Sequence, residues 1–91
     1  MKMQSHDAVE REIVGRLMDV LEQSAGGAVV PRRDDSGLDS IRRLGLNSVS
    51  MLAFLVAVED AFGIEWDDEI DEAVLGSFDA MARHIAAERG R

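Results

Sequence analysis

Ser48 is the residue whose type and surroundings are best suited to chemistry. It stands in the run LGLNSV, residues 44–49, and a long apolar stretch over residues 51–58 follows it. The glycine in this run predicts a turn that brings the serine hydroxyl to the first turn of a helix. A hydroxyl in that place can cap the helix, act as a nucleophile, or serve as the attachment point for another group.

A catalytic role for Ser48 has little support in the rest of the chain. A nucleophilic serine needs a base beside it and a site that binds the oxyanion. The chain contains no tyrosine, and its two histidines, His6 and His84, lie near opposite ends. Neither histidine has a partner at the spacing of a helical metal site. We therefore predict no catalytic residue and no metal site, and we expect Ser48 to be an attachment point or a simple helix cap.

Size and composition favour one small globular domain over residues 1–91. The chain of 91 residues has room for one core, and 46% hydrophobic residues suffice for a folded domain. No apolar run approaches the roughly 20 residues that cross a bilayer, and the first residues lack the apolar segment of a secretory signal. We expect a soluble, cytoplasmic protein. The absence of cysteine excludes disulfides and means that any thiol must come from outside the chain.

The formal net charge of −8 limits the kinds of partner. It disfavours nucleic acid and anionic membranes, and it favours proteins with a basic patch. Residues 59–72 contain eight acidic residues and no Lys or Arg. The acids over residues 67–72 lack the alternation, central glycine and final glutamate of a calcium-binding loop, so a calcium sensor is not expected.

The apolar spacing and the capping residues predict an all-α fold. We expect three main helices and one short helix, with a long first loop over residues 28–46 that contains one helical turn near residues 40–43. Asp7, Asn47 or Ser48, Asp67 or Asp68, and Ser77 are the candidate N-caps. The predicted helices cover residues 7–21, 48–62, 69–75 and 78–89. No strand-like alternation occurs, so the architecture is a small four-helix bundle.

Residues 44–69, LGLNSVSMLAFLVAVEDAFGIEWDDE, resemble the acyl carrier protein family of phosphopantetheine-binding carriers. That family combines a leucine-glycine-leucine turn, an acid, the serine and an apolar residue with a helix that ends in acids, phenylalanine, glycine and an aliphatic residue. Asn47, Ser48 and Val49 occupy the central places of this pattern. The predicted helix lengths, the long first loop and the acidity agree with the family over essentially the whole chain.

The resemblance implies a function and a cofactor. Ser48 would carry 4′-phosphopantetheine, which a phosphopantetheinyl transferase moves from coenzyme A, with Asn47 and Val49 flanking the attachment site. The helix N-terminus suits the phosphate, and the arm supplies the thiol that the chain lacks. The protein would be no enzyme. As a monomer it would shuttle acyl thioesters between loading enzymes, synthases and transferases of a fatty-acid, polyketide or related biosynthetic pathway.

Two departures from the family pattern bear on how partner proteins would bind this chain. Asn47 stands where an aspartate is usual, and the helix after Ser48 has acids only near its end, at Glu59 and Asp60. Partner docking should therefore depend on apolar contacts more than on ion pairs. The predicted docking residues are Val49, Met51, Leu52, Ala53, Glu59 and Asp60.

Two further interpretations stay open. A peptidyl carrier loaded with an amino acid is the nearest, although such carriers usually have a second glycine where Leu46 stands. A helical interaction module without a prosthetic group is the alternative from another class, and it predicts that Ser48→Ala retains function. The chain begins and ends close to the limits of the predicted domain, so we expect a discrete carrier rather than a part of a larger synthase.

Overall fold

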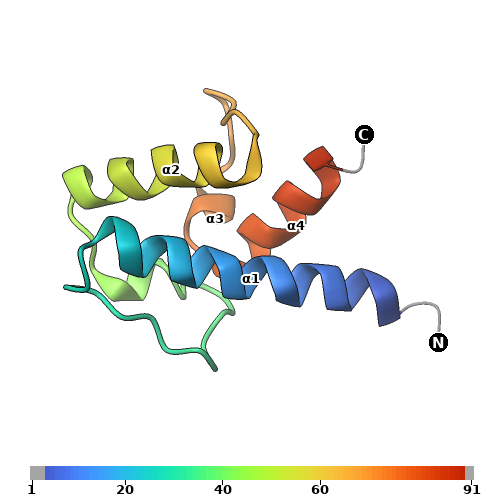
Figure 1. The fold of residues 1–91 in the computed structure, drawn as a ribbon. Helices are drawn as coiled ribbons and strands as arrows, with labels where there is room; N and C mark the ends of the chain where they lie inside the picture. Colours follow the sequence, from blue (N-terminus) through green and yellow to red (C-terminus); the bar gives the residue numbers. More distant parts are fainter. Residues whose placement is uncertain (1–3, 90–91) are drawn as a thin grey trace.

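The computed structural model describes the backbone of residues 4–89 and the side chains of residues 8–89. Within these residues the chain is all-helical, with no strand, and forms a small helical bundle (Figure 1). The predicted fold class is therefore confirmed, including the one short helix. The elements are α1 (Gln4–Ser24), the 3-10 helix η1 (Arg42–Leu44), α2 (Ser48–Phe62), α3 (Glu72–Leu75) and α4 (Phe78–Arg89).

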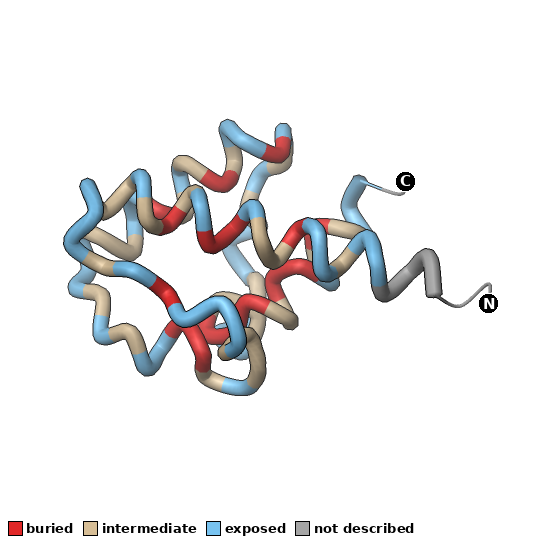
Figure 2. Tube along the Cα trace, turned by 60° about the horizontal axis from the view of Figure 1, so that its bottom comes forward, coloured by how far each residue is buried: buried red, intermediate tan, exposed pale blue. Residues whose placement is uncertain are grey.

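The hydrophobic core lies where α1 meets α2 and α4. Figure 2 shows buried positions recurring at intervals along the helices, as expected of amphipathic helices that each bury one face. Phe54 of α2 and Phe78 of α4 meet edge to face near the centre, with their ring centroids 6.5 Å apart. Both rings are fully buried. The other buried apolar residues are Ile13, Leu17, Met18, Leu21, Ile41, Val58, Phe62, Met81, Ala82 and Ile85.

Local capping signals predicted α2 and the start of α4 correctly. α2 has the expected bounds, and Gly63 ends it with φ 67, a left-handed conformation that favours glycine. At α4 the Ser77 hydroxyl accepts a hydrogen bond from the Ala80 N–H at 3.2 Å, which confirms the predicted cap. The helical turn expected near residues 40–43 is η1.

Two predicted helix starts were wrong. α1 begins at Gln4, so Asp7 lies inside the helix and is not its N-cap. α3 begins at Glu72, with the Asp71 side chain accepting the Ala73 N–H at 3.0 Å. Asp67 instead closes a separate turn, because its side chain accepts the Glu69 N–H at 2.9 Å.

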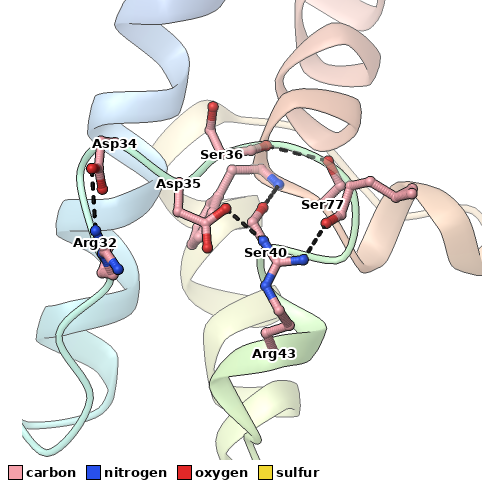
Figure 3. Close-up of polar contacts among 9 residues, drawn as sticks. Arg32, Asp34, Asp35, Ser36, Ser40, Arg43 and Ser77 are labelled. Atoms are coloured by element: carbon pink, nitrogen blue, oxygen red, sulfur yellow. Dashed lines mark hydrogen bonds and ion pairs between the residues drawn. The ribbon is translucent and has the colours of Figure 1, made fainter.

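Hydrogen bonds tie the long loop after α1 to the N-terminus of α4 (Figure 3). Ser40 is buried, and its hydroxyl accepts the Phe78 N–H at 3.0 Å. The Ser36 carbonyl accepts the Asp79 N–H at 2.8 Å and the Ser77 hydroxyl at 3.4 Å. These bonds satisfy N–H groups that a helix start leaves free. They hold the loop that leads to Ser48.

Ion pairs on the surface hold the same loop. Arg33 contacts Asp19 of α1 at 2.8 Å, and Arg43 contacts Asp35 at 2.6 Å. The hydrogen bond that Arg43 donates to Asp35 raises the pKa of Arg43 above its ordinary value. Both arginines are solvent-exposed, so their main effect is to hold the path of the loop rather than to add stability.

None of the helices within residues 4–89 has the combination of length and apolar character that spanning a membrane requires.

Candidate functional site

A short turn brings Ser48 to the surface at the start of α2. Gly45 caps the end of η1: its φ of 71 is left-handed, and its N–H donates to the Arg42 carbonyl. Only a residue without a Cβ adopts this conformation without strain. Leu46 then lies partly buried against the core, and Asn47 takes an extended conformation with ψ 175. The glycine turn predicted from the sequence therefore places Ser48 as the first residue of α2.

Asn47, and not Ser48, caps α2. The Asn47 Oδ1 accepts the Ser50 N–H at 2.8 Å, and the Asn47 carbonyl accepts the Met51 N–H at 2.9 Å. The Ser48 side chain is exposed, and its hydroxyl makes no hydrogen bond within residues 8–89. The simplest structural role for this serine, that of a cap, is therefore taken by its neighbour.

The backbone beside the Ser48 hydroxyl has free hydrogen-bonding capacity. The N–H groups of Ser48 and Val49 have no acceptor among the described residues, as is usual for the first turn of a helix. They carry the positive end of the helix dipole, which favours an anion at this place. A phosphate ester on the Ser48 hydroxyl would lie next to these groups, so the residues present suit such an ester.

A cleft of about 280 Å³ opens beside this site, between the start of α2 and the α3–α4 junction. Leu46 and Met51 reach it from either side of Ser48. Ser48 and Met51 are three positions apart on α2 and so are neighbours on the helix surface. A flexible group attached to Ser48 can therefore reach the cleft. Its lining residues are Ile41, Arg42, Leu46, Met51, Glu72, Leu75 and Gly76.

A stripe of exposed apolar residues runs along α2 from the residue after Ser48. Val49, Leu52 and Val56 are 77%, 63% and 51% exposed, and their spacing places them on one side of the helix. We call these three residues the α2 stripe. Apolar side chains grouped in this way on a helix are typical of contact surfaces for other proteins.

The other predicted docking residues differ in their surroundings. Ala53 and Asp60 are exposed, whereas Met51 is half-buried and lines the cleft. Glu59 is half-buried too, and its carboxylate accepts the Trp66 N–H at 2.9 Å. Glu59 therefore holds the α2–α3 loop in place, which leaves it less free to bind a partner than an exposed acid.

His84 does not lie beside Ser48. Its ring stacks on Trp66, with the ring centroids 5.6 Å apart and the planes at 19°. The Trp66 Nε1 donates to the Leu55 carbonyl at 3.0 Å, which places this pair about two turns along α2 from Ser48. The side chain of His6 lies outside the described residues. No group of three His, Cys, Asp or Glu residues that could hold a metal occurs in the described part of the chain.

Sequence reasoning missed Arg42, Leu75 and Gly76 as residues of the cleft, and it missed the Ser40 hydroxyl as the acceptor of the Phe78 N–H at the start of α4. The Ile41 N–H and the Arg42 N–H both donate to the Gly76 carbonyl, at 2.9 and 3.2 Å, and so join η1 to the α3–α4 junction. These residues meet only in the folded protein, and no local pattern marks them. The glycine between Leu75 and Ser77 was the one available signal, and it predicted a helix break.

No protein-family model, curated protein or solved structure matches this chain in the comparisons with known proteins.

Proposed function

We propose that this protein is an acyl carrier protein that bears 4′-phosphopantetheine on Ser48. The proposal rests on the different roles of Asn47 and Ser48 at the start of α2. Asn47 caps the helix through its bond to Ser50, while the neighbouring Ser48 hydroxyl is exposed and makes no hydrogen bond among the described residues. A hydroxyl in that position is accessible to a modifying enzyme. Because it does not cap the helix, its removal should change the stability of the fold little.

The residues around Ser48 suit the proposed attachment. The serine oxygen would form a phosphodiester, and the nucleotide half of coenzyme A would leave. The N–H groups of Ser48 and Val49, which have no acceptor among the described residues, and the helix dipole favour the added negative charge. When bound, the arm supplies a thiol that carries an acyl group as a thioester. The cysteine-free chain has no thiol of its own.

The α2 stripe is the surface that we propose for partner enzymes. A phosphopantetheinyl transferase and the enzymes that load and unload the acyl group must all approach Ser48. Val49 and Leu52 are the most exposed large apolar residues of α2, and of the α2 stripe they lie nearest to Ser48. Glu59 is engaged with Trp66, so apolar contact rather than ion pairing would dominate recognition.

The test is modification of the purified protein. Incubation with coenzyme A and a broad-specificity phosphopantetheinyl transferase should add one phosphopantetheine, measured by intact mass. Ser48→Ala should gain no mass. Ser50→Ala is the matched control, because Ser50 lies two residues further on in the same helix, and it should be modified like the unaltered protein. No mass gain with several active transferases would reject the proposal.

The exposed α2 stripe also supports a second candidate, an interaction module without a prosthetic group. The two candidates differ at Ser48. The interaction module predicts that Ser48→Ala binds its partners unchanged and that no phosphopantetheine is added. A peptidyl carrier would show the same mass gain as an acyl carrier and would differ only in accepting an amino acid as its load.

A further inference from the structure

The positively charged Arg42 lies at the rim of the cleft beside Ser48 and has N–H groups without an acceptor among the described residues. The Arg42 Nη1 donates to Asp39 Oδ1 at 3.0 Å. Its Nη2 lies 2.8 Å from where a Cβ on Gly76 would stand, so the guanidinium lies against this glycine. Within residues 8–89, Nη2 and Nε have no acceptor. Because a guanidinium has five N–H donors, Arg42 can still bind an oxygen in the cleft.

Glu72 provides a negatively charged hydrogen-bond acceptor in the same cleft. It is exposed at the start of α3, it lines the cleft with Arg42, and it forms no ion pair within the described residues. Its carboxylate can accept hydrogen bonds but cannot donate them. A second carboxylate entering the cleft would meet Glu72, which carries the same charge, while Asp39 already neutralises part of the charge of Arg42. The cleft therefore disfavours a charged acid as its occupant.

The walls of the cleft are apolar. Ile41, Leu46, Met51 and Leu75 provide them. A volume of about 280 Å³ gives room for roughly nine groups of the size of a water molecule, at ~30 Å³ each. A short carbon chain fits this space, and Leu46 and Met51 would contact it close to Ser48.

We infer that the cleft selects acyl chains that carry an uncharged hydroxyl, which accepts from Arg42 and donates to Glu72 while the carbon chain lies on the apolar walls. This inference rests on the proposed function, because Ser48 must carry the chain. A saturated chain would leave the Arg42 donors unused. A carboxylate-terminated chain would face the like charge of Glu72.

Three six-carbon loads test the inference. Ser48 is loaded from the coenzyme A thioesters of hexanoate, β-hydroxyhexanoate and adipate, and cleavage of each thioester by hydroxylamine is followed by intact mass. Each rate is divided by the rate for the same thioester on free phosphopantetheine, which removes the intrinsic reactivity of the load. The β-hydroxy load should be protected roughly two- to tenfold more than the other two, the effect expected of one net hydrogen bond.

Variants test whether Arg42 and Glu72, at the rim of the cleft, account for the extra protection. Arg42→Gln and Glu72→Gln should each reduce the extra protection of the β-hydroxy load, and Arg83→Gln on α4 is the control that should retain it. The backbone amide shifts of residues 41, 42, 75 and 76 should respond to this load in the unaltered protein. They report binding in the cleft without any enzyme activity.

The failures are distinguishable. If Ser48 accepts no phosphopantetheine, the proposed function fails and the cargo inference fails with it. If loading succeeds but all three loads are equally protected, only the cargo inference fails. It also fails if adipoyl is protected most, or if Arg42→Gln leaves the preference unchanged in a protein with unaltered melting temperature.

Discussion

The Asn47 side chain accepts the backbone N–H of Ser50 at 2.8 Å and thereby caps α2 across Ser48. Because of this bond, Asn47 has the structural role at the start of α2, and the Ser48 hydroxyl is not needed as a cap. The cap is polar and uncharged, and the serine that it spans is left exposed. The fold therefore tolerates a change at Ser48 more readily than one at Asn47.

Asn47→Ala should lower the free energy of unfolding by about 1 kcal/mol, because it removes the cap of α2. Ser48→Ala should change it by less than about 0.5 kcal/mol, as is usual for an exposed site. Asn47→Asp is the control, since aspartate caps a helix as well as asparagine does. Urea unfolding followed by circular dichroism measures all three. Equal losses for Asn47→Ala and Ser48→Ala would show that Ser48 also caps the helix.

Ser40→Ala should destabilise the protein by roughly 1–2 kcal/mol, because it leaves the buried Phe78 N–H without its partner. The same substitution should increase amide hydrogen exchange in residues 36–42, which the bonds to the α4 start hold in place. Ser50→Ala is a suitable comparison, because its side chain makes no hydrogen bond within residues 8–89. Unchanged exchange in the loop would mean that the polar network does not hold it.

Phe54→Ala should cost about 3–5 kcal/mol, since it empties a fully buried site and removes the edge-to-face contact with Phe78. Leu52→Ala, two positions earlier on the exposed side of α2, should cost less than about 0.5 kcal/mol. Thermal unfolding of both variants checks the orientation of α2. A large loss for Leu52→Ala would contradict the exposed α2 stripe.

His84→Ala should shift the fluorescence emission of Trp66 to longer wavelength, because removing the stacked ring exposes the indole to water. The chain has one tryptophan, so the signal reports this site alone. Arg83→Ala, at the neighbouring position on α4, should leave the emission unchanged. If neither variant moves the emission, the two rings do not stack in solution.

Val49→Asp should reduce kcat/KM of the phosphopantetheinyl transferase roughly tenfold, the equivalent of about 1.4 kcal/mol of lost contact energy. Glu59→Gln should have a smaller effect, because its amide oxygen can still accept the Trp66 N–H and the original carboxylate is not free for docking. Transferase kinetics on the two variants compare them directly. The reverse order would show that acids dominate recognition.

The fold was predictable from the sequence wherever a local signal decided it. Asn47, Gly63 and Ser77 mark helix ends through their own backbone and side chains, so α2 and the start of α4 were predicted correctly. The start of α3 was not, because Asp67, Asp68 and Asp71 are all competent caps. The attachment of Trp66 to Leu55 and Glu59 holds the preceding loop, and only the folded chain reveals that contact.

The same distinction applies to the candidate site. Ser48, Asn47 and the glycine turn are contiguous, and their arrangement could be predicted from the sequence. The cleft could not, because the approach of Arg42 to Gly76 depends on backbone bonds between η1 and the α3–α4 junction. The exposure of Val49 and Leu52 was likewise undetermined, since α2 is apolar nearly all round and its packing against α1 and Phe78 of α4 decides which side is covered.

The most direct measurement is the intact mass of the protein after incubation with coenzyme A and an active phosphopantetheinyl transferase. The account predicts a gain of one phosphopantetheine on the unaltered protein and on Ser50→Ala, and none on Ser48→Ala. An unchanged mass with several transferases, each active on a control carrier, would contradict it. So would a gain that persists in Ser48→Ala.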